Sequence, residues 1–212
     1  MLGLYVTVPV ACFRKGLARE YLETEPLPPP ATCYGFLLSL VGETDRRRHI
    51  GARVAPVLIS KPATSVVLRT VWRVKKTPLG SSGNTRPDYQ QLLTGVELVI
   101  WLDSTEEADD GLEQRVRETL ANPATISRFG GLSLGESTHL VDEVSLVTSP
   151  QTRLADRSGR AFLRAERGRL TLPVWVDHVG SAGTRYVTGD LVETSALTMP
   201  LLASMPTISP DY

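Results

Sequence analysis

The sequence predicts an α+β fold of the ferredoxin-like kind, with a projecting β-hairpin and a small β-rich lobe at its C-terminal end. Strand-like and helix-like segments follow one another as strand, helix, strand, strand, helix, strand over residues 1–150. A glycine- and serine-rich tip separates the two middle strands, and residues 151–212 hold only short strand-like pieces and an irregular tail. We therefore expect a ferredoxin-like domain over 1–150 and a small β-rich lobe over 151–212.

The first strand and the first helix show different periodicities. The segment LGLYVTVPVA alternates and is rich in β-branched residues, which predicts a strand from Leu2 to Pro9. A polar connection that ends in prolines leads to a helix over about Pro30 to Val41, where apolar residues recur at the helical period and form one face. These apolar residues are Cys33, Phe36, Leu37, Leu40 and Val41.

The middle of the chain predicts a long hairpin. ARVAPVLISKP indicates the second strand and TSVVLRTVWRVKKT an alternating third strand. The tip PLGSSGNTRPD follows, and TGVELVIWLD returns as a strand. Because the tip is long and polar, we expect the distal part, about Arg69 to Leu93, to stand clear of the body.

A second helix and a further strand complete the predicted domain. STEEADDGLEQRVRETLANP has Ser104 or Thr105 at its start, acids in its first turn and Asn122-Pro123 at its end. This pattern is typical of a capped, solvent-facing helix. HLVDEVSLV then predicts a strand, and RAFLRAERGRLTLPVWVDHV supplies the strand-like pieces of the lobe.

Composition bounds the class of protein. A chain of 212 residues with 42% hydrophobic and 22% charged residues is typical of a soluble globular protein. No apolar run approaches the ~20 residues of a membrane span, and the beginning of the sequence lacks a secretory signal pattern. Cys12 and Cys33 are isolated, which favours a reduced pair in a cytoplasmic protein over zinc or a disulfide.

Charge is balanced overall but divided into blocks. The chain holds 23 basic and 23 acidic residues, a balance that argues against nucleic-acid binding when taken as an average. Between Arg46 and Gln91, however, there are ten Lys or Arg against one acid, Asp88. From Leu92 to Pro150 there are three basic residues against eleven acidic ones. Such blocks suit a protein that binds a polyanion on one face and a protein neighbour on another.

The basic hairpin gives the sharpest functional signal. Cations neutralise phosphates, and aromatic rings stack on exposed bases for about 1–3 kcal/mol each. The alternative is a solvated hairpin whose arginines protect an edge strand from aggregation. The hairpin residues in question are Arg69, Trp72, Arg73, Lys75, Lys76, Arg86 and Tyr89.

Two further segments are weaker candidates. DRRRH (Asp45 to His49) is either a solvated loop or a phosphate contact. RFGGLSLGES (Arg128 to Ser137) lacks the spacing of a nucleotide cradle, so we expect a tight loop that packs against a backbone. With three histidines and no HExxH, CxxC, GxSxG or Walker pattern, the sequence predicts no catalytic residue, metal or cofactor.

Four segments together resemble the fifth CRISPR-associated protein family, nearest to its type I-B and myxobacterial-type members. The match covers residues 1 to about 150, while the C-terminal 60 residues match only loosely. The helix start PPPATCYG and the Leu-Gly-x-Ser loop are its most specific parts. The four segments are LYVTVPVACFRK, PLPPPATCYGFLLSLVGE, NTRPDYQQLLTGVELVIWL and GGLSLGESTHLVDEV.

The resemblance implies an RNA-recognition (RRM or RAMP) form of the ferredoxin-like fold. It further implies a non-catalytic subunit of a type I Cascade complex, which caps the 5′ handle of the crRNA. Its thumb, at about 69–93, would fold over the guide. Its partners would be the backbone and large subunits, with target DNA met only through the complex. The helix at Pro30 would lie beside the handle, with Tyr34 near its exposed end.

The residues expected to contact RNA come from all four matched segments and the loops between them. They are Arg14, Tyr34, Arg46, Arg47, Arg48, Arg69, Trp72, Arg73, Lys75, Lys76, Arg86, Tyr89, Gly131, Ser133, Ser137 and His139.

Three questions stay open at this point. One branch of the family, type I-C, cleaves precursor guide RNA; here His139 lacks a neighbouring Lys-His pair, and His139 with Tyr34 would be the pair available for a metal-independent endoribonuclease. A protein-only scaffold is the other alternative. Gly35 weakens its helix by about 1 kcal/mol relative to alanine, and its missing side chain would allow close approach of either a sheet or an RNA backbone.

Overall fold

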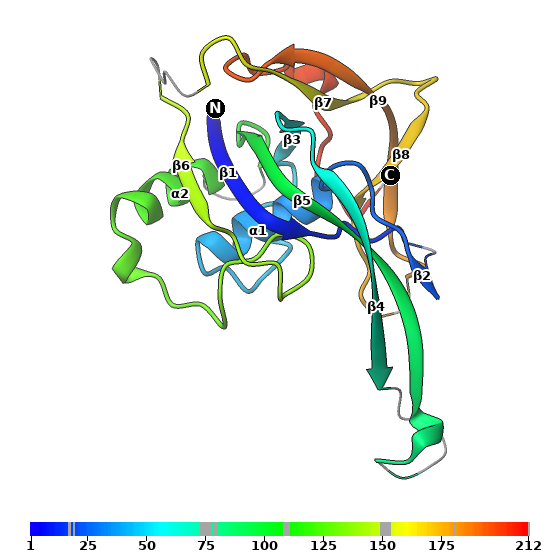
Figure 1. Ribbon diagram of the computed structural model, residues 1–212. Coiled ribbons are helices and arrows are strands. Elements are labelled where there is room, and N and C mark those ends of the chain that lie inside the picture. Colours follow the sequence, from blue (N-terminus) through cyan, green and yellow to red (C-terminus); the bar gives the residue numbers. More distant parts are fainter. Residues whose placement is uncertain are drawn as a thin grey trace.

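One mostly antiparallel sheet organises the computed structural model (Figure 1). The structure describes residues 1–212 except 17, 19, 73–77, 79, 108–110, 149–153, 180 and 212, and of Trp72 and Ser82 only the backbone. Within this described part, nine strands form the sheet and two α-helices pack against it. No helix among the described residues is long and apolar enough to cross a bilayer.

Four strands form the part of the sheet that underlies both helices, in the order β6-β1-β5-β3. β1 runs antiparallel to β5 from the Leu2–Leu102 pair to the Ala11–Leu93 pair. The strands are β1 (Leu2–Ala11), β3 (Arg53–Leu58), β5 (Thr85–Asp103) and β6 (Glu143–Leu146). The α+β class predicted from the sequence is confirmed.

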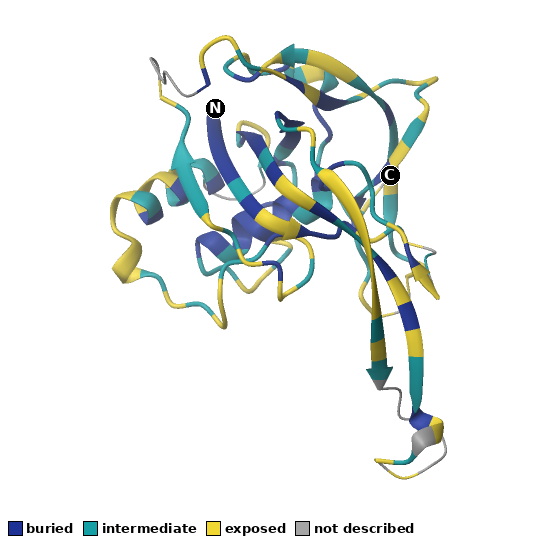
Figure 2. Ribbon diagram, viewed as in Figure 1, coloured by how far each residue is buried: buried dark blue, intermediate teal, exposed yellow. Residues whose placement is uncertain are grey.

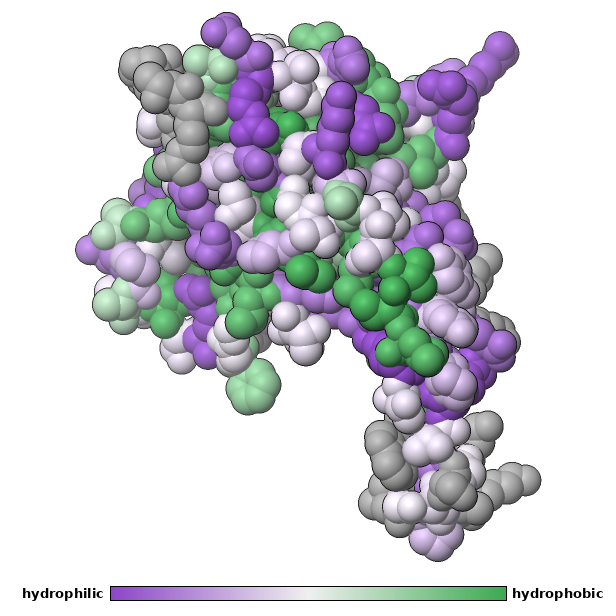
Figure 3. Space-filling view, in the orientation of Figure 1, coloured by the Kyte–Doolittle hydropathy of each residue, from purple (hydrophilic) through white to green (hydrophobic). Residues whose placement is uncertain are grey.

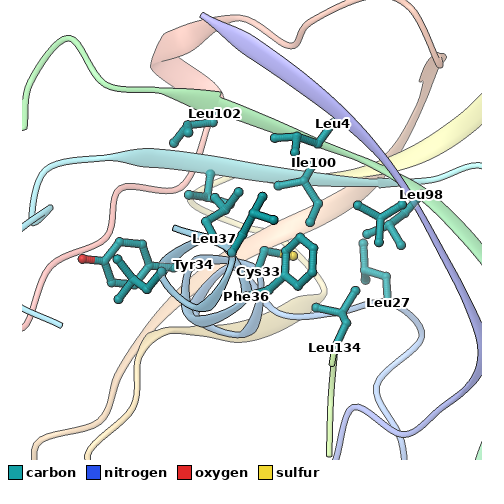
Figure 4. Packing of buried hydrophobic residues seen from close by; sticks show 14 of the residues in the cluster. Leu4, Leu27, Cys33, Tyr34, Phe36, Leu37, Leu98, Ile100, Leu102 and Leu134 are labelled. Atoms are coloured by element: carbon teal, nitrogen blue, oxygen red, sulfur yellow. The ribbon is translucent and has the colours of Figure 1, made fainter. Parts of the chain in front are cut away.

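Both helices lie on one face of this sheet, whereas the C-terminal segment contributes buried residues to both faces. α1 (Pro30–Leu40) and α2 (Leu112–Ala121) cover one face. The alternation along β5 places Leu98 and Ile100 against α1, as Figure 4 shows, and turns Val99 and Trp101 the other way. On that second face lie buried residues of the C-terminal segment, namely Leu154, Ala161, Ala196 and Met205.

A hairpin extends from the body in Figure 1. β4 (Ala63–Trp72) pairs with the first half of β5, from Ala63–Thr94 to Trp72–Thr85, and the short 3-10 helix η1 (Ser82–Asn84) lies at its tip. The short β2 (Tyr21–Leu22) pairs in parallel with β5 on the other side. Figure 2 shows β4 as mostly exposed, in contrast to the buried second half of β5.

The C-terminal strands continue the same sheet. β7 (Ser158–Arg164) pairs with β3, β9 (Arg185–Ser195) with β7, and β8 (Leu170–Trp175) with β9. Strands from 1–150 and from 151–212 thus share one hydrogen-bonded network, through a short β3–β7 ladder. Two further 3-10 turns are η2 (Pro123–Thr125) and η3 (Leu202–Ser204).

The start of the second helix differs from the prediction. α2 begins at Leu112 rather than beside Ser104, and its N-cap is Gly111 in a left-handed conformation, with φ 51°. Ser104 nevertheless reaches the first turn, because its Oγ accepts a hydrogen bond from the Glu113 N–H at 3.1 Å. The Glu107 carboxylate accepts one from the Leu112 N–H at 2.9 Å. The cap is therefore supplied across a loop instead of by the preceding residue.

Candidate nucleic-acid interface

The predicted contact residues form two groups, one at the base of the hairpin and one along the exposed side of α1. The loop over residues 131–140 joins the groups, because Ser133 and Gly135 line a cavity beside α1 while Glu136 contacts the hairpin. Three predicted residues, Arg73, Lys75 and Lys76, lie outside the described residues, and for Trp72 only the backbone is described.

Three arginines line a hollow of about 460 Å³ at the base of the hairpin: Arg14, Arg69 and Arg86. Arg69 Nη1 forms an ion pair with Glu136 Oε2 at 3.2 Å, and Arg86 Nη1 forms one with Glu20 Oε1 at 3.0 Å. Arg86 Nε also contacts Asp88 Oδ1 at 3.0 Å, and Glu20 and Asp88 line the hollow themselves. Carboxylates therefore partly neutralise two of the three cations before any ligand binds.

Both paired arginines keep a donor for a further acceptor. Arg69 Nε and Arg86 Nη2 are buried, and neither has a hydrogen-bond partner among the described residues. A buried donor left without an acceptor costs about 1–3 kcal/mol. The hollow therefore offers charge-assisted donors to an oxygen-rich ligand such as a phosphate.

An exposed aromatic pair lies beside the hollow. Tyr89 of β5 has 52% of its surface exposed, and Tyr21 of β2, its partner in the parallel pairing, has 42%. Sequence analysis singled out Tyr89 but missed Tyr21, because Tyr21 lies in a polar connection where nothing predicts a strand. Exposed tyrosines on adjacent strands are suited to base stacking.

His139 anchors the loop to the end of β1. It is 7% exposed, and its Nδ1 accepts hydrogen bonds from the Cys12 N–H at 3.2 Å and the Glu136 N–H at 3.1 Å. Both contacts require an unprotonated Nδ1, and burial lowers the pKa of His139. Gly135 allows the turn, because its φ is +106° and a Cβ there would lie 2.8 Å from the Cys12 carbonyl oxygen.

The other loop candidates lie nearer the surface. Ser133 bridges to Leu140 and lines the cavity beside α1. Gly131 and Ser137 are exposed. A Cβ on Gly131 would come within 2.9 Å of Leu140, so a side chain there would displace its neighbour.

Tyr34 does not lie at an exposed end of α1, and that expectation was wrong. Its ring is 2% exposed and packs with the core (Figure 4), because it falls on the buried side of the helix. The hydroxyl donates to the Arg46 carbonyl oxygen at 2.8 Å. Burial raises the pKa of Tyr34 well above its usual range.

Gly35 faces open space. No atom lies within 4 Å of the position that its Cβ would occupy, so close packing of helix on sheet does not explain this glycine. The space beside it is a cavity of about 300 Å³ between the exposed side of α1, the end of β8 and the loop over 131–140.

The three consecutive arginines of the loop after α1 have different surroundings. The Arg46 guanidinium lies 4.5 Å from the centroid of the Trp175 ring, and its Nη2 donates to the Val176 carbonyl oxygen at 2.7 Å. Arg47 is exposed. Arg48 forms an ion pair with Glu43 at 3.0 Å.

A buried polar cluster holds this loop in place. His49 is fully buried, with Nδ1 2.8 Å from Glu107 Oε2 and Nε2 2.8 Å from Arg115 Nη1. Arg115 also contacts Glu43 at 2.6 Å, which ties the loop to α2. Glu43 accepts hydrogen bonds from two backbone N–H groups and from Arg115, which lowers its pKa to about 2.

The cavity beside α1 includes residues that sequence analysis missed. Trp175, Val176 and His178 come from the C-terminal segment, which the pattern identifies only as strand-like. The available signal is the WVDH sequence at the end of a strand, where an aromatic and a histidine come close together. Among the described residues no group of His, Cys, Asp and Glu could hold a metal ion.

No protein-family model matches the chain. The CRISPR-associated protein Cas5 of Myxococcus xanthus (strain DK1622) is 53% identical over 212 residues, covering 98% of this chain and 97% of that protein. The chain belongs to the Cas5 family. The resemblance inferred from four segments is confirmed, and membership in the Cas5 family extends through the C-terminal residues that matched only loosely.

Solved structures show a shared fold at low sequence identity. A chain of a "CRISPR RNA-guided surveillance complex" has a TM-score of 0.61 at 13% identity, covering 92% of this chain and 90% of the other. A second structure, described as "Crystal structure of Cas protein", has a TM-score of 0.54 at 16% identity, covering 92% and 94%. The chain thus shares its fold with these two structures although few residues are identical.

Proposed function

We propose that this chain is the Cas5-type subunit of a type I CRISPR Cascade complex and binds the 5′ handle of the guide RNA without cutting it. Support comes from membership in the Cas5 family and from similarity to a chain of an RNA-guided surveillance complex. The observation that carries the RNA-binding part is the hollow of Arg14, Arg69 and Arg86 at the base of the hairpin, where buried donors lack an acceptor.

We infer a ferredoxin-like core of the RAMP kind from the order of its elements. β1, α1, β3, β5, α2 and β6 follow one another as strand, helix, strand, strand, helix, strand. The strands lie as fourth, first, third, second across the sheet. The β4–β5 hairpin is then the thumb, and it extends from the body, which leaves it accessible to a guide strand (Figure 1).

Protein neighbours in the proposed complex are the backbone and large subunits. The hairpin offers one surface for them, because Val66, Val67 and Leu68 are exposed on β4. Figure 3 shows hydrophobic side chains gathered on the hairpin close to the body. Clusters of this kind on an exposed strand favour contact with another protein. Target DNA would be met only through the assembled complex.

The local geometry favours binding over cleavage. A metal-independent ribonuclease needs a base and an acid within reach of the reacting atoms. His139 Nδ1 already accepts two backbone N–H groups, and the Tyr34 hydroxyl donates to a backbone carbonyl from inside the core. Both polar groups are thus already engaged in hydrogen bonds that hold the loop over 131–140 and the residues after α1, which supports binding without cleavage.

Crosslinking within the native assembly tests the proposal. The chain is co-expressed with its genomic neighbours and a CRISPR array, irradiated, and mapped by mass spectrometry. We expect crosslinks from the 5′ handle to residues 69–89 and 131–137. A particle without RNA would instead favour a protein-only scaffold, and release of a 5′ product by the purified chain alone would favour an endoribonuclease.

Charge reversal at one exposed residue provides the matching perturbation. Arg14 is exposed and lines the hollow, so Arg14→Glu should weaken RNA binding and reduce its salt dependence. Arg167→Glu, on an exposed turn between β7 and β8, makes the same change of charge away from the hollow and serves as the control. Equal effects of the two variants would contradict a localised site.

A further inference from the structure

Arg46 is an arginine held in place on the surface. Its carbonyl oxygen accepts a hydrogen bond from the Tyr34 hydroxyl at 2.8 Å, and its guanidinium donates to the Val176 carbonyl oxygen at 2.7 Å. The guanidinium carbon lies over the Trp175 ring, 4.5 Å from the ring centroid. These three contacts, one to α1 and two to the end of β8 and the residue after it, fix both the backbone and the head of this side chain. A side chain ordered in advance loses little conformational freedom when a ligand binds.

Arg46 forms no ion pair with a carboxylate within the described part of the chain, although Asp45, Asp177 and Asp211 line another of the hollows that it borders. Arg48, two residues on, pairs with Glu43, and Arg115 pairs with the same carboxylate. Arg46 instead contacts a ring and a carbonyl oxygen, both of which leave its positive charge available. A guanidinium held in place without a direct ion pair is suited to stack on the flat π-system of a ligand.

The exposed face of this guanidinium borders the cavity beside Gly35. Trp175 lies on one side of the guanidinium, and Arg46 lines three adjoining hollows, so part of this side chain is accessible to a ligand. The cavity of about 300 Å³ is at the lower end of the range for small-molecule sites. A flat ring of the size of one nucleobase suits this volume.

Other residues that line the cavity offer hydrogen-bonding groups for the edge of a base. Thr32 and Ser39 of α1 and Ser133 of the loop line the same cavity, and each hydroxyl both donates and accepts hydrogen bonds. Gly35 has no side chain, and the space that its Cβ would occupy is open, because no atom lies within 4 Å of that position. The loop that carries Ser133 leads directly to the arginine hollow, so a strand bound there can deliver a base here.

We propose that the cavity beside Gly35 receives a single unstacked base of the bound RNA, with Arg46 on Trp175 as its stacking platform. This inference rests on the proposed RNA-binding function and adds a base-binding pocket to it. Arginine planes stack on splayed RNA bases. Each such stack contributes about 1–3 kcal/mol, which corresponds to about 5- to 150-fold in affinity.

An abasic scan tests the pocket. The 5′-handle sequence is read from RNA in the purified complex, and synthetic handle RNAs are made with one base removed at each position in turn. Binding to the full-length chain is measured by fluorescence anisotropy. For the native protein, one abasic position should weaken binding by about 5- to 150-fold. In Arg46→Ala, which should bind the intact RNA more weakly, the same abasic position should cause no further loss.

Two variants separate stacking from charge and from general damage. Arg46→Lys keeps the charge but lacks the planar head, so it should behave like Arg46→Ala in the abasic scan while keeping the salt dependence of the native chain. Arg167→Ala is the control for loss of one exposed arginine, and it should retain the full abasic effect. Thermal unfolding of each variant checks that the fold is kept.

The results distinguish this inference from the proposed function. An abasic effect that persists in Arg46→Ala, or native behaviour of Arg46→Lys, would overturn the pocket while leaving RNA binding intact. Unchanged RNA affinity of Arg46→Ala together with failure to assemble with protein neighbours would also overturn it, since the cavity would then receive a protein segment. No RNA binding by the native chain, alone or in its complex, would overturn both.

Discussion

Replacement of Glu43 by glutamine should destabilise the fold through the loop that carries Arg46. The Glu43 carboxylate is 9% exposed and accepts charge-assisted hydrogen bonds from Arg115 at 2.6 Å and Arg48 at 3.0 Å. It also accepts the backbone N–H groups of Thr44 and Asp45, both at 2.9 Å. The amide nitrogen of a glutamine is a donor, so it would face N–H groups that now donate to a carboxylate oxygen. The hydrogen bonds to one of the two oxygens must therefore break.

The magnitude follows from the pKa of Glu43. The hydrogen bonds from the Asp45 backbone and from Arg115 lower that pKa from 4.5 to about 2. A difference of this size corresponds to about 3 kcal/mol of preference for the ionised form in the folded state. Because the folded pKa is the lower one, this contribution is fully present above pH 4.5 and is lost as the pH falls toward 2. We expect Glu43→Gln to cost about 2–3 kcal/mol at neutral pH and little near pH 2.

Urea unfolding followed by tryptophan fluorescence at several pH values measures this effect. Glu166→Gln changes an exposed glutamate in the turn after β7 and is the matched control, expected to stay within about 0.5 kcal/mol of the native chain. Native stability for Glu43→Gln at neutral pH would refute the reasoning. So would a loss that stays the same at every pH, because the effect would then not come from the charge.

Other predictions follow from the loop over 131–140 and from the hairpin. Gly135→Ala, at φ +106° and against the Cys12 carbonyl oxygen, should cost about 1–2 kcal/mol or more in urea unfolding. Stability of the native chain should fall as the pH drops through the pKa of an unfolded histidine, because burial lowers the pKa of His139 and its Nδ1 accepts two N–H groups; this fall should be smaller in His139→Gln. Leu68→Lys, at a position 62% exposed, should change unfolding by no more than about 0.5 kcal/mol but reduce light scattering by the isolated chain. Unchanged scattering would mean that the exposed apolar side chains of β4 do not drive self-association.

Local patterns were sufficient for most of the fold. The alternation of LGLYVTVPVA and the helical spacing after Pro30 predicted β1 and α1 within one or two residues, because these elements bury one face each. The start of α2 could not be predicted in this way. Its cap is Gly111, while Ser104 and Glu107 satisfy its first N–H groups across a loop, and only the folded loop geometry brings them together.

The site was less accessible to sequence reasoning than the fold. Counting charges identified Arg69 and Arg86 but could not show that Glu136 and Glu20, far away in the sequence, pair with them. The family resemblance implies that Tyr34 lies near an exposed end of α1, whereas its ring packs in the core. The WVDH sequence draws attention to Trp175, but nothing in the sequence indicates that this ring contacts Arg46, about 130 residues earlier in the chain.

The length of β5 has a mechanical consequence. Its nineteen residues run from the hairpin into the middle of the sheet, where the second half lies between β1 and β3. The backbone leaves strand geometry at Gly95, whose φ is +74°, near the point where the hairpin joins the body. Force applied to the outer half by a partner therefore reaches the centre of the molecule along one covalent strand that passes through this irregular position. A partner that binds the hairpin therefore acts on a strand whose second half is buried in the centre of the sheet, so that binding at the hairpin is mechanically coupled to the core.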